Sequence, residues 1–518
     1  MNHLLALDAG TGSGRAVLFD ERGQQLAAAS REWTHRSEPQ HPGSMTFDRD
    51  RNWQLLAACI REVLDQVPDA NVVGVSTTSM REGIVLYDAH GQELWACANV
   101  DARAIQEVRE LRQRDPELEY RLYLRSGQTF ALGAAPRLLW LQRHEPDLYA
   151  RTAYVAMLSD WVATRLGAPI AVDPSNGGTT GLFSLDTRRW DPSIAEACGL
   201  RADLLQAPVV EAGTVIGQVS ARAAEATGLK QGAPIVMGGG DAQLGAVGVG
   251  AVEPGQAAVF GGSFWQQEVN LDRPLADESG RIRMNFHAVP RLWQAEAIVF
   301  FPGIAVRWFR DAICPDIKAQ AQAEGRDAYA LLEEMAAQVP PGAHGIVPIY
   351  SDAMDYMHWR HAAPSFLNLT VDPAVTTRGA LFRALQENAA IVTRANLERI
   401  AQVTGSFPSH VIFASGASKG PLWCQILADV LQAPVHTRVV KEATALGAAI
   451  CAGTGVGLYT DIPSAAQKLV QEERVYQPDP ANGPIYQEAF QRWQAAYPVQ
   501  LALADQGVTT SMWRAPGE

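Results

Sequence analysis

Apolar and small polar residues alternate in blocks at the start of the chain. Residues 4–7 and 16–19 are apolar runs, and the segment between them is made largely of Gly, Thr, Ser and Ala. Two short apolar runs joined by turn-forming residues predict a β-hairpin whose tip has unusual conformational freedom. Asp8 falls where the first strand ends. The hairpin therefore holds a carboxylate beside a glycine-rich turn.

The pattern after the hairpin predicts a meander, a helix and a further strand. Residues 26–33 form a third strand, and residues 72–76 are short and β-branched. Between them, residues 52–67 place their apolar side chains at helical spacing. Three antiparallel strands followed by a helix and a strand are typical of the actin-like, ribonuclease-H-like ATPase fold. Further on, we expect a hairpin over 84–100 and mainly helices over 103–150.

The second half of the chain repeats the plan of the first. An apolar strand at 235–237 runs into three glycines and Asp241, and small residues continue to about residue 255. Residues 257–264 then give a new strand, glycines and a hydroxyl. We therefore expect two α/β domains of the same fold, residues 1–250 and 251–518, with a cleft between them.

Two later segments complete this second half. Residues 411–420 lead from a strand through a glycine turn into a helix, which suits an adenosine and its phosphates. A plain strand-to-helix turn is the alternative. Residues 439–457 close with a helix rich in Ala and Gly, whose small side chains allow close packing. A polar turn at 173–181 either borders the ligand cleft or is an ordinary loop.

Composition narrows the function classes. The 518 residues carry 43 Lys and Arg against 56 Asp and Glu, a formal charge of −13. An acidic chain without a basic cluster is a poor candidate for binding nucleic acid or a membrane surface. The six cysteines form no C-x-x-C pair, so we expect buried, reduced thiols in a cytoplasmic protein. No apolar run reaches the roughly 18–20 residues of a membrane helix.

The first turn has the chemistry of a phosphate site. Gly10, Gly12 and Gly14 let backbone N–H groups point into one concavity, while Thr11 and Ser13 supply hydroxyls. Arg15 adds positive charge, and Asp8 would face a metal ion. The alternative is a tight hairpin with small residues at its tip. The chain has no P-loop, no complete dinucleotide fingerprint and no H-E-x-x-H motif.

Three charged residues suggest how an acceptor could be bound and activated. Arg81 and Glu82 can present donors and acceptors to vicinal hydroxyls, although a solvated pair on a loop is the alternative. Asp241, at the end of a strand, could accept a proton from a hydroxyl that attacks the γ-phosphate of ATP. Positioning matters more than base strength in such a transfer, since its transition state is loose.

These features resemble the FGGY family of carbohydrate kinases, which includes glycerol, xylulose and gluconate kinases. The resemblance covers nearly the whole chain. Within the family, the chain is most similar to the branch that phosphorylates the quorum-sensing signal autoinducer-2. The runs that carry this similarity are residues 79–87 (SMREGIVLY), 95–103 (WACANVDAR), 136–141 (PRLLWL), 171–176 (AVDPSN), 262–267 (GSFWQQ), 361–366 (HAAPSF), 440–447 (VKEATALG) and 509–513 (TTSMW).

The resemblance implies a role for each matching position. Asp241 matches the catalytic base, and Asp8 and Asp241 are expected near Mg²⁺. The positions expected to bind nucleotide or phosphate are Thr11, Gly12, Ser13, Arg15, Gly261, Gly262, Ser263, Gly303, Arg307, Gly416, Ala417 and Gly420. The positions expected to bind substrate are Arg81, Glu82, Asp101, Asp241 and Trp265. Some relatives also have a regulatory phosphocarrier protein as a partner.

Four positions depart from the family pattern. Asn99 stands where sugar kinases often have Trp, and Ala242 replaces a polar residue that contacts glycerol in glycerol kinases. Arg137 replaces Lys, and Ser415 replaces Gly. The first two departures favour a different small polyol-like acceptor, for which the resemblance implies open-chain dihydroxypentanedione. A pentulose kinase and an actin-like ATP-binding sensor without transfer chemistry are the alternatives.

Overall fold

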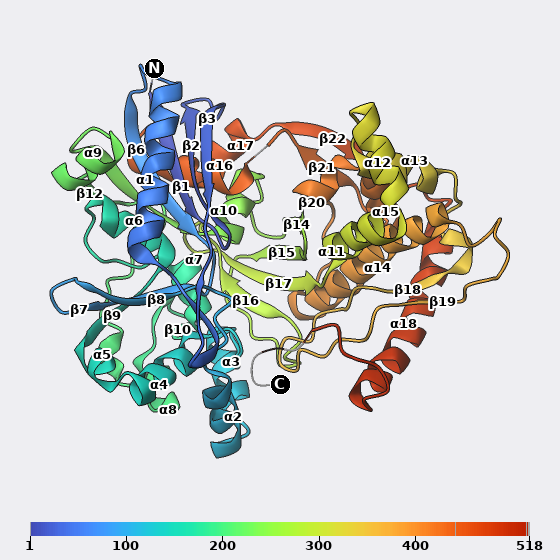
Figure 1. The fold of residues 1–518 in the computed structure, drawn as a ribbon, viewed down its shortest axis with the longest axis horizontal. Helices are drawn as coiled ribbons and strands as arrows, with labels where there is room; N and C mark the ends of the chain where they lie inside the picture. The colour runs from blue at the N-terminus through green and yellow to red at the C-terminus, as the bar shows by residue number, and fades with distance from the viewer. Residues whose placement is uncertain (1, 441, 514, 516–518) are drawn as a thin grey trace.

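The structure is a computed structural model that describes residues 2–440, 442–513 and 515. Within these residues, two large mixed sheets lie in the two halves of the molecule, and helices cover both (Figure 1). Lys441, in the run 440–447, lies outside the described residues. The first sheet has the order β12 (Val215–Gln218), β13 (Pro234–Gly240), β6 (Val72–Ser79), β1 (His3–Ala9), β2 (Ser13–Asp20), β3 (Gln25–Glu32). The second has the order β16 (Arg283–Phe286), β17 (Trp293–Val299), β15 (Trp265–Leu271), β14 (Ala257–Gly261), β20 (Val411–Ala414), β21 (Val435–Arg438), β22 (Glu472–Tyr476).

Smaller sheets and helices surround these two layers. A third sheet has the order β4 (Arg36–Glu38), β5 (His41–Thr46), β8 (Glu93–Cys97), β7 (Ile84–Asp88), β9 (Thr152–Met157). Two short hairpins pair β10 (Phe183–Ser184) with β11 (Arg189–Trp190) and β18 (Val347–Ile349) with β19 (Ser365–Leu367). The helices of the first half are α1 (Arg49–Gln66), α2 (Ile105–Arg114), α3 (Leu118–Ser126), α4 (Ala134–His144), α5 (Pro146–Arg151), α6 (Leu158–Leu166), α7 (Pro174–Gly177), α8 (Pro192–Cys198), α9 (Ala221–Thr227) and α10 (Asp241–Gly248). Those that follow are α11 (Pro302–Trp308), α12 (Pro315–Glu324), α13 (Ala328–Ala337), α14 (Arg378–Thr404), α15 (Pro421–Leu431), α16 (Ala443–Gly455), α17 (Ile462–Leu469) and α18 (Gly483–Asp505).

The two large sheets share one pattern of pairing. In the first sheet, β3, β2 and β1 pair antiparallel, β1, β6 and β13 pair parallel, and β12 returns antiparallel. In the second, β17, β15 and β14 pair antiparallel, β14, β20 and β21 pair parallel, and β22 returns antiparallel. The prediction of one actin-like fold used twice is therefore confirmed.

Strand β1 is apolar because both of its faces are buried. Leu5 and Leu7 pack in the same cluster as residues of α1, whereas Leu4 and Ala6 pack with residues of α16. A strand covered on both faces reads as a continuous apolar run. The apolar run stops at Asp8, close to the end of β1, where the predicted turn begins.

Helix α16 packs on the first sheet although it lies near the end of the chain. It contacts β1, β6, β13 and α10. A Cβ on Gly447 would come within 1.9 Å of the Leu244 carbonyl oxygen, and one on Gly248 within 1.8 Å of the Ala443 carbonyl oxygen. The small residues of this helix are therefore required by backbone contact with α10, as their composition predicted. The division of the chain into two domains at residue 250 stays a prediction, because α16 comes after that residue in the chain and yet packs on the first sheet.

The structure differs from the sequence-based expectation at residues 173–181. They form α7 and the 3₁₀ helix η1 (Gly178–Thr180), and their polar side chains are buried. Asp173 caps α7 by accepting from the Asn176 backbone N–H at 2.9 Å. The Asn176 amide donates to the hydroxyls of Ser79 and Ser159 at 3.0 and 2.9 Å. The segment is a hydrogen-bonded support beneath the end of β6.

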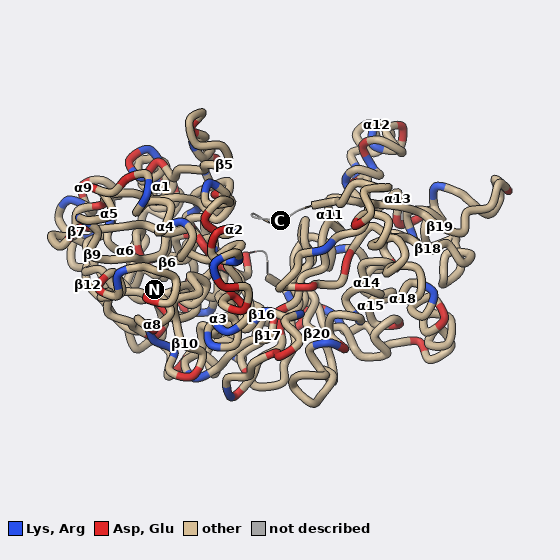
Figure 2. Tube along the Cα trace, turned by 90° about the horizontal axis from the view of Figure 1, so that it is seen from below, with Lys and Arg blue, Asp and Glu red and all other residues tan. Residues whose placement is uncertain are grey.

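The charges and cysteines agree with the expectations from composition. Figure 2 shows acidic and basic residues interspersed over both halves of the molecule. All six cysteine side chains are buried free thiols. Among the described residues, no helix has the length and apolar character needed to cross a membrane.

Candidate active site

A cavity of about 1160 Å³ is lined by residues of both halves. The hairpin β1–β2 contributes Asp8 and Arg15, and the start of α10 contributes Asp241. Ser415 and Gly416, which follow β20, line the opposite part. The structure therefore brings the predicted metal, base and adenosine positions to one cavity. It is large enough for a nucleotide with a small acceptor.

Asp8 has an oxygen with no protein partner. Its Oδ1 is buried without a hydrogen bond within the described residues. Burial, and after it the charge of Asp241, raises the pKa of Asp8 to about 7 against the opposing effect of Arg15. A buried carboxylate oxygen without a donor fits a bound cation. The described residues contain no cluster of three His, Cys, Asp or Glu side chains, so a Mg²⁺ here would take water and phosphate oxygens as its other ligands.

Asp241 is held between a strand and a helix. It is the first residue of α10, directly after the three glycines that end β13. Its Oδ1 accepts from the Ala242 backbone N–H at 2.8 Å. Burial raises the pKa of Asp241 to about 6 against the opposing effect of Arg81. The pKa therefore lies close enough to neutrality for the side chain to accept a proton and still be ionised at pH 7.

Arg15 faces Asp8 across the hairpin and is tied to a distant segment. The two residues are direct partners in the β1–β2 register. Arg15 also forms an ion pair with Glu442, the residue before α16. Glu442 lines the same cavity. It lies in one of the runs that carry the resemblance, but nothing in the sequence marked it as a partner of Arg15.

The first phosphate turn is compact and open to solvent. The Gly10 N–H donates to the Ser13 carbonyl at 3.0 Å, which closes the turn. Thr11 and Gly12 are exposed, and the Thr11 hydroxyl donates to Asn99 Oδ1 at 3.3 Å. The predicted phosphate-binding residues therefore lie at an accessible tip.

The second phosphate turn lies against the predicted adenosine turn. A Cβ added to Gly261 would come within 2.7 Å of the Ala417 Cβ, and one on Gly303 within 2.2 Å of the Gly262 carbonyl oxygen. Four predicted nucleotide positions are thus in direct contact. Ser415 has φ of 76° and occupies the left-handed region that the usual glycine adopts freely.

Three further nucleotide positions lie around this group. Ser263 is exposed beside Gly262, and Arg307 is exposed on α11. Gly420 lies against the Glu333 carboxylate, which would meet its Cβ at 2.3 Å. Glu333 in turn accepts from the Trp423 backbone N–H at 3.2 Å, at the start of α15.

Arg81 and Glu82 are buried rather than solvated. Arg81 donates to both oxygens of Glu296, with its Nη1 at 2.5 Å from Oε2 and its Nη2 at 2.9 Å from Oε1. Glu82 accepts from Arg283 Nη2 at 2.6 Å. Both bonds cross from the first half to the second sheet. The alternative of a solvated loop pair is therefore wrong.

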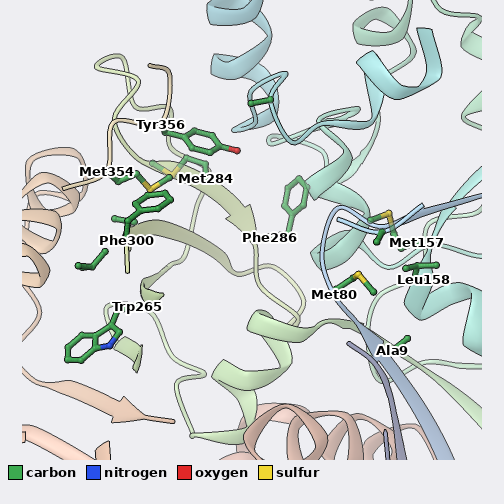
Figure 3. Packing of buried hydrophobic residues seen from close by; sticks show 14 of the residues in the cluster. Ala9, Met80, Met157, Leu158, Trp265, Met284, Phe286, Phe300, Met354 and Tyr356 are labelled. Atoms are coloured by element: carbon green, nitrogen blue, oxygen red, sulfur yellow. The ribbon is translucent and has the colours of Figure 1, made fainter. Parts of the chain in front are cut away.

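Two predicted substrate residues lie elsewhere. Asp101 accepts from the Arg103 side chain and from the Met45 N–H at 2.6 Å, so both its oxygens are engaged. Trp265 is fully buried, with its ring 4.9 Å from both Phe413 and Trp423. Figure 3 shows it among the buried hydrophobic residues, apart from Ala9 and Met80. Like Arg81 and Glu82, neither side chain is among the residues that line the cavity, and their contact with the substrate stays a prediction.

Two residues near the site, Gln266 and Phe264, were not predicted from the sequence. Their positions follow from the alternation of side chains along β15. Side chains alternate between the two faces of β15, so the residue after Trp265 lines the cavity. That residue is Gln266. The exposed aromatic side chain beside the second turn is Phe264, with its ring 5.2 Å from that of Phe301. Reading residues 264–268 by alternation could have found both.

Comparisons with known proteins agree with this geometry. The model of the N-terminal domain of the FGGY family of carbohydrate kinases matches residues 3–248, and that of the C-terminal domain matches residues 269–456. The chain is 53% identical to an autoinducer-2 kinase of Salmonella paratyphi A, covering 100% of this chain and 98% of that protein. It is 54% identical to an autoinducer-2 kinase of Klebsiella pneumoniae, with the same coverage.

A solved structure shows the same architecture. The xylulose kinase of Rhodospirillum rubrum superposes with a TM-score of 0.86 at 27% identity, covering 98% of this chain and 100% of that one. Two family models that together span most of the chain, and relatives of this identity over its full length, decide its membership. The chain belongs to the FGGY family of carbohydrate kinases.

Proposed function

We propose that the protein transfers the γ-phosphoryl group of ATP to the terminal hydroxyl of autoinducer-2 in its open-chain form, dihydroxypentanedione. The products are phospho-autoinducer-2 and ADP. The observation that carries the proposal is the match of 53% and 54% identity over the full chain to autoinducer-2 kinases. The cavity supports it, because the base and the phosphate-binding arginine line the same space.

Asp241 is the proposed catalytic base. Its carboxylate accepts the proton of the acceptor hydroxyl as the hydroxyl oxygen attacks the γ-phosphorus and the bond to the ADP oxygen breaks. Arg15 and the backbone N–H groups of the two turns stabilise the negative charge on the phosphates. Arg81 and Glu82 orient the acceptor, since both are themselves fixed by buried partners.

Asp8 and Asp241 are the proposed ligands of Mg²⁺. When bound, the ion neutralises negative charge on the ATP phosphates during the transfer. The unpartnered Oδ1 of Asp8 supports this assignment. We further propose that the two halves close around both substrates, because water in the cavity would hydrolyse ATP unproductively. The regulatory phosphocarrier partner and the cytoplasmic location stay predictions.

A substrate panel tests the proposed function. The purified protein is supplied with ATP, Mg²⁺ and one of dihydroxypentanedione, xylulose, ribulose or glycerol, and the products are identified by mass spectrometry. We expect the highest kcat/KM with dihydroxypentanedione. A preference for a pentulose would overturn the proposed substrate. ATP binding without a phosphorylated product from any acceptor would favour the sensor alternative.

A further inference from the structure

One face of the second sheet carries a cluster of buried polar side chains. Apart from Gln267 and Ile298, the strands β15, β17 and β16 alternate between apolar residues on one face and polar residues on the other. The polar face looks toward the first half, since Arg283 and Glu296 on it bond to Glu82 and Arg81. Its members are Gln266, Glu268 and Asn270 on β15, Gln294 and Glu296 on β17, and Arg283 and Asn285 on β16.

Two carboxylates on this face lie directly opposite each other. Glu268 and Glu296 are partners in the β15–β17 register. Both guanidinium nitrogens that reach this face from Arg81 bond to Glu296, so Glu268 has no cation of its own within the described residues. Like charges in this arrangement repel. A second ionised carboxylate at this buried position is therefore unfavourable.

Glu268 has unused hydrogen-bonding capacity. It is 1% exposed, and its Oε2 accepts from Gln294 Nε2 at 2.9 Å. Its Oε1 is buried without a partner in the described structure, as is the Oε1 of Gln294. Buried polar atoms of this kind are usually satisfied by a ligand or ordered water.

A second buried side chain without hydrogen-bond partners among the described residues lies in α10. Gln243 is fully buried, and neither its Oε1 nor its Nε2 has a partner within the described residues. A Cβ built on Gly240 would be 2.5 Å from Gln243 Oε1 and 3.3 Å from Arg81 Cγ. Gln243 therefore lies beside Arg81, two residues after Asp241.

The polar face begins at the cavity. Gln266 lines the cavity, and Glu268 is the next residue on the same face of β15. Ala242 also lines it and has no side chain long enough to fill the space. Glu268 therefore lies one position beyond a cavity-lining residue, on the face that looks toward Arg81.

We propose that Glu268 and Gln243 bind the carbonyl-bearing end of the acceptor and select a vicinal dicarbonyl over a simple polyol. The inference rests on the proposed function and adds two residues to the acceptor site. A carbonyl oxygen only accepts hydrogen bonds, so the wall that holds it must donate. The amide of Gln243 can donate, and a protonated Glu268 can donate through Oε1. Burial and the charge of Glu296 support this state, because they raise the pKa of Glu268 to about 8.

Substitutions at Glu268 test the proposal. Glu268→Gln keeps a donor and should change kcat/KM for dihydroxypentanedione only slightly. Glu268→Met removes it, and we expect KM for this acceptor to rise about 10- to 100-fold, as for a lost hydrogen bond of 1–3 kcal/mol. KM for ATP should not change. Gln294 Nε2 keeps Asn270 Oδ1 at 3.2 Å as an acceptor, so the strand pairing survives.

The matched control is Gln267→Met, one residue earlier on the opposite face. Gln267 bonds to Asn396 in the core, so its loss should lower the melting temperature without changing KM for the acceptor. If Glu268→Met behaves in the same way, with lower stability and an unchanged acceptor KM, the proposal is overturned. Gln243→Leu should reproduce the rise in acceptor KM, and an unchanged KM there would remove Gln243 from the site.

The test separates this inference from the proposed function. If the wild-type protein prefers a pentulose, the proposed substrate fails. The Glu268→Met and Gln243→Leu variants are then measured on that pentulose, whose single ketone also requires a donor. A raised KM would keep both residues in the acceptor site, whereas an unchanged KM would overturn their role as well.

Discussion

Arg81 forms a two-point ion pair with Glu296 across the interface between the halves of the molecule. The bond lengths are 2.5 and 2.9 Å, and the side chains are almost completely buried. A planar guanidinium bonded at two points has one orientation. The pair therefore joins the segment after β6 to β17 and fixes the group that we propose orients the acceptor.

Breaking this ion pair should lower the free energy of unfolding strongly only when one charged partner remains buried without the other. We expect Arg81→Met or Glu296→Met to lower the free energy of unfolding by about 3–5 kcal/mol, because each leaves a buried charge without its partner. The double variant should recover most of this loss, while phosphorylation stays defective. Denaturant unfolding of the four proteins measures the coupling.

A surface pair is the control for this cycle. Arg31 and Glu62 also form an ion pair, but both side chains are 41% exposed. Glu62→Gln should change the free energy of unfolding by less than about 1 kcal/mol. Equal losses at Glu62 and Glu296 would contradict the structural role assigned to the buried pair.

Asp241→Asn should remove the base and leave the fold. Asn has nearly the same shape, and its side-chain oxygen can still accept from the Ala242 N–H. We expect turnover to fall by about 10²- to 10⁴-fold, the usual contribution of a positioned base. Mass detection of the product measures the loss, and calorimetry should find ATP binding largely intact. Turnover near the wild-type rate would exclude Asp241 as the base.

Asp8→Asn should stabilise the protein without ligands while impairing transfer. Burial raises the pKa of Asp8 from its ordinary 3.8 to about 7, so the folded state binds this proton more tightly than the unfolded chain. Stability from this group is therefore lost as pH rises between about 4 and 7. The melting temperature of Asp8→Asn relative to wild type should increase over that window and then level off. A constant difference across the window would contradict the shifted pKa.

Sequence patterns predicted the fold well because each pattern has one physical cause. The run before Asp8 is apolar since helices cover both faces of β1, and the glycines of α16 allow contact with α10. The hairpin at residues 36–46 was missed, since β4 and β5 carry few apolar residues and are partly exposed. Local sequence signals do not specify such pairings.

Side-chain roles were harder to predict because they depend on long-range partners. Trp265 directly follows an exposed turn but points into the core of the second half. Asp101, in the loop after β8, is engaged by Arg103, two residues away, and by Met45 on β5. Arg81 appeared ambiguous in isolation, because its partner Glu296 is 215 residues further along the chain. Only the folded structure brings such partners together.

Gly303 provides a test of how closely the nucleotide-binding elements are packed. It is the second residue of α11, and an added Cβ would lie 2.2 Å from the Gly262 carbonyl oxygen and 2.9 Å from the Ser263 Cα. Both contacts are with backbone, so the turn itself must move. Because a displacement of about 1 Å can reduce catalysis 10²-fold, we expect Gly303→Ala to lower kcat/KM for ATP by about 10- to 100-fold.

The control for Gly303→Ala is a similar clash between residues that do not line the cavity. A Cβ on Gly379 would lie 2.7 Å from the Met335 carbonyl oxygen, where α14 meets α13. Gly379→Ala should therefore lower the melting temperature without raising KM for ATP. Gly303→Ala should raise KM for ATP even where the protein remains folded. If both variants changed only stability, the contact between Gly303 and the second turn would serve the fold alone.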